Sequence, residues 1–213
     1  MPLNLTLRRR ITVTAIRAAK RWAPSAVRRW LWEREYTSGR WDYLDGGDDP
    51  LPTALVRKYA RGGRILDLGC GTSANLRLDA DGYSFYLGVD ISPDAIERAR
   101  RLGRPASEFE VADVTTFRPP GRFDLVLLRE VVYYLPAARA ADLVRRTGDS
   151  LTADGVIAVV IWNTELYGRT ADAVRRCGLP IVEEFAHRPD ALTLVLGPPP
   201  GGSGTAGAAG ARS

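Results

Sequence analysis

The sequence has few cysteines, histidines and lysines, and these shortages exclude several classes of protein. Its 213 residues include two cysteines, Cys70 and Cys177, which are too few for a disulfide framework or a cysteine-rich zinc site. A single histidine, His187, excludes a multi-histidine metal centre. No apolar run approaches the roughly 20 residues that a membrane-spanning helix needs. We therefore expect a cytoplasmic globular protein that holds no metal.

Positive charge is concentrated in the first forty residues. Residues 1–40 contain ten basic and two acidic side chains, a net charge of +8, whereas the remainder carries −3. Apolar residues recur at helical spacing beside these arginines, and Pro24 divides the segment into two predicted helices. Two interpretations remain open. The segment is either a basic helix that contacts a membrane surface or a protein partner, or a helix that packs on its own domain.

From residue 64 onward the pattern alternates between strands and helices. Strands are predicted over 64–68, 83–89, 108–111, 123–128, 155–162, 181–186 and 191–196, and helices over 51–60, 73–79, 93–102, 136–150 and 170–177. Repeated strand–helix units indicate an α/β fold with a doubly wound parallel sheet. The short turn Arg188-Pro189-Asp190 requires an antiparallel final pair. We therefore predict an N-terminal arm over 1–50, a domain over 51–196 and a disordered Gly/Pro/Ala tail over 197–213.

Acidic and glycine residues fall where the predicted parallel strands end. The first strand contains Asp67 and leads into Gly69-Cys70-Gly71, a turn expected to open a helix. Its glycines allow a sharp turn and the close approach of a ligand. Asp90 ends the second strand, where a carboxylate can accept both hydroxyls of a ribose. Asp113 follows the third strand and can accept from an adenine amino group. These positions predict a site for a ligand that contains a nucleoside.

Five segments resemble, in order and spacing, the motifs of the class I S-adenosylmethionine-dependent methyltransferases. They are ILDLGCGTS, YLGVDISPDAIERAR, FEVADVTTF, FDLVLLREVVYYL and LTADGVIAVV. The resemblance covers about 65–196 and implies a Rossmann-like seven-stranded sheet with a reversed last strand. It also implies S-adenosylmethionine as cofactor and methyl transfer to a small-molecule acceptor, such as a secondary metabolite or a sugar-like compound.

The resemblance assigns both ends of the cofactor to residues at the strand ends. The methionine end is assigned to Asp67, Gly69, Cys70, Gly71 and the backbone carbonyl of Arg129. The adenosine end is assigned to Asp90, Ile91, Asp113 and Val114. A third glycine is common after such a turn, and Ser73 stands there in this chain.

Residues on the acceptor side follow from the same resemblance. The aromatic stretch 32–44 is similar to the N-terminal lid of small-molecule methyltransferases, in which Tyr36 and Trp41 would shield the sulfonium. Glu130 and Tyr134 follow the fourth strand and are the candidate catalytic residues. Glu130 is either a base or a structural carboxylate, and Tyr134 is either a proton acceptor or a wall of the pocket. His187 is expected to be structural. A connection of about eight residues after the fifth strand predicts a small or open acceptor pocket.

Other functions remain as alternatives. The acceptor is alternatively a peptide, a carrier-bound intermediate or a nucleic acid, although the Asn/Asp-Pro-Pro-aromatic motif for nucleobase amines is absent after the fourth strand. A non-catalytic S-adenosylmethionine-binding partner protein is a further alternative. An NAD-dependent oxidoreductase is disfavoured because Asp67 precedes the first glycine and Asp113 has no role in that scheme. Neither lysine has the tyrosine four residues upstream that small dehydrogenases use.

Overall fold

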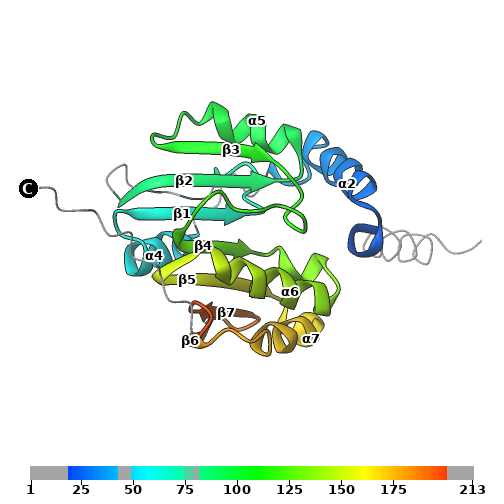
Figure 1. Ribbon diagram of the computed structural model, residues 1–213. Helices are drawn as coiled ribbons and strands as arrows, with labels where there is room; N and C mark the ends of the chain where they lie inside the picture. The colour runs from blue at the N-terminus through cyan, green and yellow to red at the C-terminus, as the bar shows by residue number, and fades with distance from the viewer. Residues whose placement is uncertain (1–18, 43–48, 75, 77, 79–81, 201–213) are drawn as a thin grey trace, which may run out of the picture.

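The computed structural model describes residues 19–42, 49–74, 76, 78 and 82–200. Its centre is a seven-stranded sheet in the order β3-β2-β1-β4-β5-β7-β6 (Figure 1). The strands are β1 (Gly63–Leu68), β2 (Tyr83–Asp90), β3 (Ser107–Val111), β4 (Phe123–Arg129), β5 (Leu151–Trp162), β6 (Ile181–Arg188) and β7 (Ala191–Leu196). Strand β7 lies antiparallel between β5 and β6, while the strands from β3 to β5 run parallel. The predicted doubly wound sheet with a reversed last strand is confirmed.

Local sequence signals mark where some of the helices begin. They are α2 (Ser25–Thr37), α4 (Pro50–Tyr59), α5 (Pro93–Arg101), α6 (Ala137–Thr147) and α7 (Thr164–Arg175). Ser92 caps α5 by accepting a hydrogen bond from the Ala95 amide, with Pro93 in the first turn. The predicted break at Pro24 is confirmed, because a helical segment ends at residue 22 and α2 begins at Ser25. None of the helices in the described ranges is long and apolar enough to span a bilayer.

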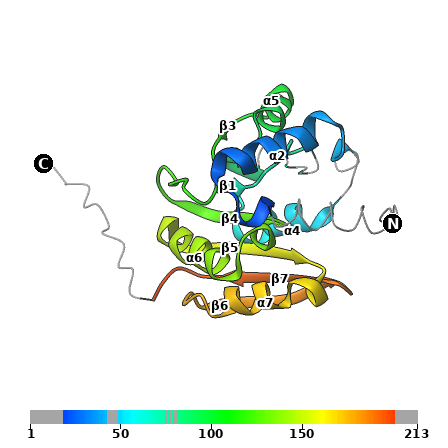
Figure 2. The same cartoon turned by 90° about the vertical axis from the view of Figure 1, so that its right-hand side faces the viewer.

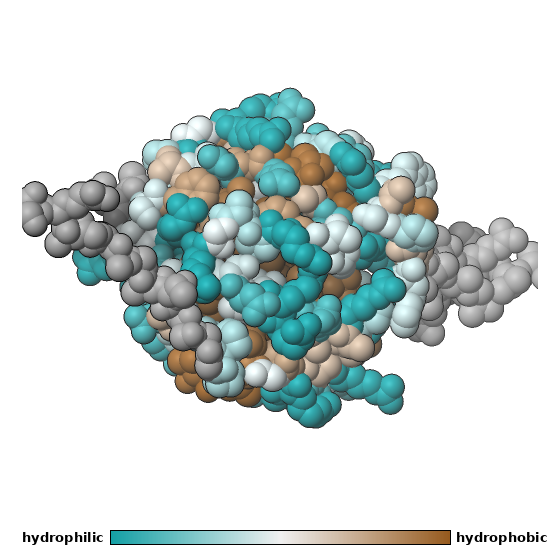
Figure 3. All heavy atoms as spheres, viewed as in Figure 1, coloured by the Kyte–Doolittle hydropathy of each residue, from teal (hydrophilic) through white to brown (hydrophobic). Residues whose placement is uncertain are grey.

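Helices cover both faces of the sheet. Successive strand residues point to opposite faces, so Leu66 packs with α6 and α7 in one core while Ile65 packs with α4 in the other. Helix α5 buries Ala95, Ile96 and Ala99, and its outward side is hydrophilic, as the top of Figure 3 shows. Both faces are therefore buried, which explains the near-continuous apolar runs of the central strands.

The strand order changes side at β1: β2 and β3 follow on one side of it, and β4 and the later strands lie on the other side. Strand β1 pairs with β2 on one side and with β4 on the other, so the crevice beyond their carboxyl ends is the topological switch point where ligands bind in such sheets. Helix α2 lies across this end of the parallel strands (Figures 1 and 2). The fold thus places the segment 25–37, from the N-terminal arm, over the expected ligand site.

Two sequence predictions were wrong, and hydrogen bonds explain both. The helix expected over 73–79 does not form in the described residues, because Ser73 has a left-handed backbone (φ +57°) and Arg104 Nη2 donates to the carbonyls of Ser73 and Leu76. The connection after β5 is one residue instead of about eight. Asn163 caps α7 immediately, accepting from the Leu166 amide, and a kink at Tyr167 disguises the helical pattern.

The remaining predictions on the N-terminal arm and the tail fall largely on residues 1–18, 43–48 and 201–213, outside the described residues. Within the described arm, Trp22 and Trp30 are exposed. Contact of this arm with a membrane or a protein partner stays a prediction.

Candidate functional site

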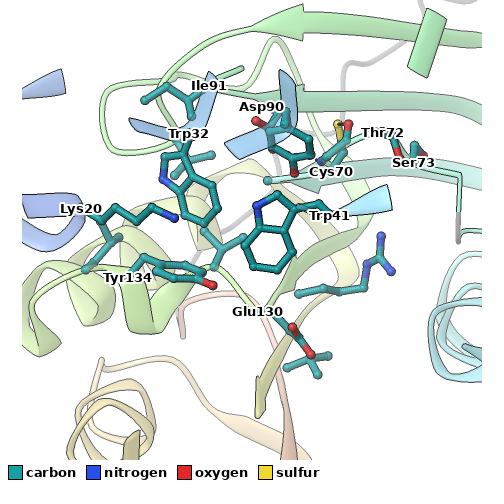
Figure 4. A pocket seen from close by; sticks show the side chains of 18 of the residues that line it. Lys20, Trp32, Trp41, Cys70, Thr72, Ser73, Asp90, Ile91, Glu130 and Tyr134 are labelled. Carbon is teal, nitrogen blue, oxygen red and sulfur yellow. Dashed lines mark hydrogen bonds between the residues drawn. The ribbon is translucent and has the colours of Figure 1, made fainter. Parts of the chain in front are cut away.

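A cavity of about 390 Å³ opens at the carboxyl edge of the sheet. This volume lies within the range of about 300–1,000 Å³ that is usual for small-ligand sites. The predicted site residues that line it are Tyr36, Trp41, Gly69, Cys70, Gly71, Asp90, Ile91, Asp113, Val114, Arg129, Glu130 and Tyr134 (Figure 4). Asp67 is outside this lining and is buried behind it. The fold therefore brings together at one cavity residues that lie up to about a hundred positions apart in the sequence.

The glycine turn after β1 leaves no room for side chains. Gly69 and Gly71 both have left-handed backbones, with φ values of +79° and +55°. A Cβ on Gly71 would lie 2.8 Å from the Tyr36 hydroxyl oxygen, and one on Gly69 would lie 2.2 Å from Val131 Cγ2. The turn lines the cavity through its backbone, with Tyr36 packed close to Gly71 and Val131 packed close to Gly69.

Asp90 fixes the glycine turn and also faces the cavity. Its Oδ2 accepts from the Gly71 amide at 3.0 Å, and its Oδ1 accepts from the Ser92 amide at 2.9 Å. Burial raises the pKa of Asp90 from its ordinary value of 3.8 to about 6, although the hydrogen bonds from Ser92 and Gly71 act in the opposite direction. Each carboxylate oxygen has a further lone pair, so the group can still accept two hydroxyls.

Asp113 joins the sheet to the overlying helix α2. Its Oδ2 accepts from Arg28 Nη2 at 2.5 Å and from the Ser25 hydroxyl, and its Oδ1 accepts from the amide and hydroxyl of Thr115. Burial alone would raise the pKa of Asp113, but the hydrogen bonds from Ser25 and Thr115 outweigh burial and lower it. The structure shows Asp113 as an anchor for α2. Its contact with adenine stays a prediction.

Asp67 forms a buried pair with Arg129. The side chain of Asp67 is wholly buried, and its Oδ2 accepts from Arg129 Nη2 at 3.2 Å and from the Tyr86 hydroxyl at 2.9 Å. Its Oδ1 has no hydrogen-bond partner among the described residues. A buried acceptor of this kind calls for a donor, from a ligand or from water. Arg129 lines the cavity, so the pair joins the buried Asp67 to a cationic side chain of the cavity wall.

The two candidate catalytic residues have different surroundings. Glu130 has a left-handed backbone (φ +57°), a strained conformation for a non-glycine residue that is often found at functional sites. Its Oε2 accepts from the Tyr133 hydroxyl at 3.2 Å. Tyr134 packs edge-on against Trp32, with ring centroids 4.7 Å apart, and burial raises its pKa. The phenol of Tyr134 is therefore a poor proton acceptor at neutral pH, and Glu130 is the better candidate.

Several lining residues were missed from the sequence. They are Lys20, Arg28, Trp32, Asp49, Leu51, His187 and Arg188, among others. His187 lies at the end of β6, where its Nδ1 is 2.9 Å from the Thr193 hydroxyl, and burial lowers its pKa. Lys20 is one of only two lysines among the thirty basic residues, and the structure shows that its side chain is almost fully buried.

Comparison with known proteins agrees with this architecture. A family profile described as "Methyltransferase domain" matches residues 65–155. Trans-aconitate 2-methyltransferase of Methylobacterium nodulans is 31% identical over 182 residues, which make up 81% of this chain and 62% of that protein. Residues 65–155 therefore form a methyltransferase domain of the class I S-adenosylmethionine-dependent type. The chain spans less than two thirds of the length of that relative.

Solved structures of low sequence identity share the methyltransferase fold. A TehB-like S-adenosylmethionine-dependent methyltransferase of Corynebacterium glutamicum has a TM-score of 0.61 and 23% identity, over 77% of this chain and 97% of that chain. The N-methyltransferase NodS of Bradyrhizobium japonicum, in complex with S-adenosyl-L-homocysteine, has a TM-score of 0.57 and 20% identity, over 73% and 94%. At these identities the likeness is evidence for the fold alone.

The cofactor of this methyltransferase family, S-adenosylmethionine, fits the residues that line the cavity. The glycine turn lines the cavity without side chains at Gly69 and Gly71, so its backbone can lie against a ligand. The carboxylate of Asp90 faces the cavity at the end of β2, and a buried oxygen of Asp67 has no described partner to donate to it. Donors on the cofactor, its ribose hydroxyls and its ammonium, match these acceptors in kind.

Proposed function

We propose that the protein transfers a methyl group from S-adenosylmethionine to a small-molecule acceptor. One observation supports this most strongly: the glycine turn, Asp90 and an aromatic lid all line one cavity at the switch point of a methyltransferase fold. The absence of an insertion between β5 and α7 favours a small acceptor, because the acceptor side is then built from α2 and the segment after β4. Two similar proteins are named for small-molecule substrates: trans-aconitate 2-methyltransferase and the dTDP-3-amino-3,6-dideoxy-alpha-D-glucopyranose N,N-dimethyltransferase of Streptomyces fradiae.

In this proposal the chain contributes mainly position and shielding. When bound, the cofactor supplies an electrophilic methyl group on a sulfonium. Asp90 accepts the ribose hydroxyls, and the backbone of Gly69 and Gly71 lies against the methionine part. Trp41 and Tyr36 keep water away from the sulfonium. Displacement at a methyl group gains most from holding the reacting atoms in line, because effective molarity is then the main source of acceleration.

Glu130 is proposed to accept the proton that an ammonium or hydroxyl acceptor must lose. We expect Glu130→Gln to lower the turnover rate by roughly a hundredfold, since general base catalysis contributes about 10²–10⁴. Affinity for the cofactor should stay unchanged. Tyr134→Phe, the matched control in the same segment, should change the rate less than about threefold, because its raised pKa disfavours the phenolate. Initial rates and cofactor titrations of both variants measure this, and equal rates for Glu130→Gln and the wild type would remove Glu130 from this role.

Binding of the cofactor should weaken in acid. The carboxylate of Asp90 accepts hydroxyls only when ionised, and its pKa is about 6, so ionised acceptor is lost as the pH falls through 6. We expect the dissociation constant of S-adenosylmethionine to rise about tenfold between pH 7 and pH 5, since one pH unit below the pKa changes the ionised fraction tenfold. Titrations at intervals of half a pH unit measure the curve. Asp90→Asn should flatten it, and a wild-type affinity independent of pH would contradict the assignment.

Calorimetric titration of the purified protein with S-adenosylmethionine and, separately, with NADH tests the proposal directly. We expect micromolar binding of the first compound and none of the second. Binding of NADH alone would overturn the proposal in favour of an oxidoreductase. Binding of neither would point instead to the alternative in which the protein acts through a partner.

A further inference from the structure

The ammonium of Lys20 lies in a cage of aromatic rings within the cavity (Figure 4). Its Nζ is 3.5 Å from the ring centroid of Trp32, 5.6 Å from that of Tyr134 and 5.9 Å from that of Trp41. The same Nζ donates to Glu35 Oε2. Three rings and a carboxylate around one nitrogen match the composition of sites that bind amines and quaternary ammonium groups.

The walls of this cage hold one another without Lys20. Trp41 Nε1 donates to Glu35 Oε2 at 3.1 Å, and Trp32 packs against both Trp41 and Tyr134, with ring centroids 5.9 and 4.7 Å apart. Helix α2, which bears Trp32 and Glu35, is fixed to the sheet by the contact between Arg28 and Asp113 described above. The cage is therefore a formed site whichever cation occupies it.

Lys20 belongs to a different segment from its surroundings. It lies in the short helical segment 19–22, and the chain breaks at Pro24 before α2 begins. Two of the cage side chains come from α2, Trp41 follows that helix, and Tyr134 comes from the 3₁₀ turn Val132–Tyr134. The break at Pro24 thus separates the backbone that carries Lys20 from the backbone that carries Trp32 and Glu35.

We propose that the cage is the subsite for an amino group of the acceptor, and that Lys20 occupies it as an internal stand-in. This inference rests on the proposed methyltransferase function and names its substrate class: a small molecule with a primary or secondary amine. The acceptor nitrogen takes the place of Lys20 Nζ among Trp32, Trp41 and Tyr134. Lys20 then moves out with its own segment.

Electrostatics favour an amine over an anionic acceptor in this cage. The faces of the three rings are negative, and Glu35, which also pairs with Arg40 at 3.6 Å, places a carboxylate oxygen at the cage. The cage itself therefore attracts a cation more than an anion, while the arginines of the cavity line other parts of it. Burial lowers the pKa of the Lys20 ammonium although Glu35 acts to raise it. An acceptor amine in the same surroundings would likewise release its proton more readily, which frees the lone pair that attack requires.

The resulting transfer balances in atoms and electrons. The neutral amine nitrogen forms a bond to the methyl carbon as the carbon–sulfur bond breaks, and the electron pair of that bond stays on sulfur, which becomes a neutral thioether. The nitrogen now bears one positive charge and loses a proton to Glu130 or to water. No oxidant or reductant is needed.

Binding of three small branched probes of different charge tests the inference: cationic tetramethylammonium, neutral tert-butanol and anionic pivalate. Each is titrated into the full chain, with Lys20→Met compared with the wild type, and tryptophan fluorescence reports occupancy. We expect Lys20→Met to bind tetramethylammonium about tenfold more tightly than the wild type does, because the internal cation no longer competes for the rings. Neither tert-butanol nor pivalate should show a gain. In the Lys20→Met background, Trp32→Leu should abolish the gain, whereas Trp30→Leu, an exposed tryptophan of the same helix, should leave it intact.

Two results would overturn the inference. One is binding of pivalate by the wild type that Lys20→Met loses, which would make Lys20 a binding residue for anionic acceptors. The other is an unchanged affinity for tetramethylammonium in Lys20→Met, with wild-type thermal unfolding showing that the variant is folded. A parallel titration with S-adenosylmethionine separates the two hypotheses, because cofactor binding with a failed cage test leaves the methyltransferase proposal standing. If Lys20→Met gains affinity for tetramethylammonium but the chain binds no S-adenosylmethionine, the cage inference stands as a binding site and the methyltransferase proposal fails.

Discussion

Replacing Asp90 by alanine should weaken binding of S-adenosylmethionine by more than a hundredfold. The substitution removes the proposed acceptor for two ribose hydroxyls, and each hydrogen bond to a charged group is worth about 1.5–3 kcal/mol. It also leaves the amides of Gly71 and Ser92 without their acceptor, so the glycine turn loses its support. Both effects weaken the binding of S-adenosylmethionine. Methyl transfer should be lost together with binding.

A carboxylate outside the cavity provides the control for this experiment. Asp154 is exposed in β5 and is not part of the cavity lining, so Asp154→Ala should bind the cofactor as the wild type does. Calorimetric titration gives both affinities, and thermal unfolding shows whether the Asp90 variant is folded. A folded Asp90→Ala protein with affinity within a few-fold of the wild type would place the ribose elsewhere in the cavity.

Replacing Arg129 by methionine should destabilise the fold by about 3–5 kcal/mol. This is the usual cost of removing one partner from a buried ion pair, because the remaining charge stays desolvated and uncompensated. The Asp67 side chain is 0% exposed, and its Oδ1 already has no partner among the described residues. In the variant, the Tyr86 hydroxyl would remain as a donor to the Asp67 carboxylate among the described residues.

An exposed ion pair of the same chain separates the effect of burial from the effect of charge. Arg175 pairs with Glu184 at 2.7 Å and with Asp172 at 2.8 Å, on the surface. Arg175→Met should cost no more than about 1 kcal/mol, as exposed pairs do. Urea unfolding monitored by circular dichroism gives both values. Similar losses in the two variants would mean that Asp67 finds compensation elsewhere, or is protonated, when Arg129 is absent.

The sheet and the residues that line the cavity at its carboxyl edge were predictable because their signals are local. A buried strand that ends in an acid, a turn with two glycines and Ser92 before Pro93 each act within a few residues of chain. The order of the strands followed from resemblance and from the short final turn. Ser73 shows the limit of such reasoning, because its backbone is fixed by Arg104, thirty-one positions away. No pattern of neighbouring residues contains that contact.

The acceptor side was only partly predictable, because it depends on how α2 lies over the sheet. The aromatic stretch pointed to a lid, and Tyr36 and Trp41 do line the cavity. The anchors of that lid are pairs between distant segments, Arg28 with Asp113 and Glu33 with Ser92. The basic residues of the arm have the spacing of a solvent-exposed helix face. Nothing in that spacing distinguished Arg28 and Lys20, which are buried, from their exposed neighbours.

The position of β7 has a consequence for how the protein is made. This strand is the last of the sheet in chain order, yet it lies between β5 and β6, and all six of its residues are buried. During synthesis on the ribosome, the paired edge of β5 therefore stays open until the chain has been extended past residue 196. An apolar strand with an open edge is a site for aggregation. Nascent chains halted before residue 191 should thus depend on chaperones, whereas those released after residue 200 should not.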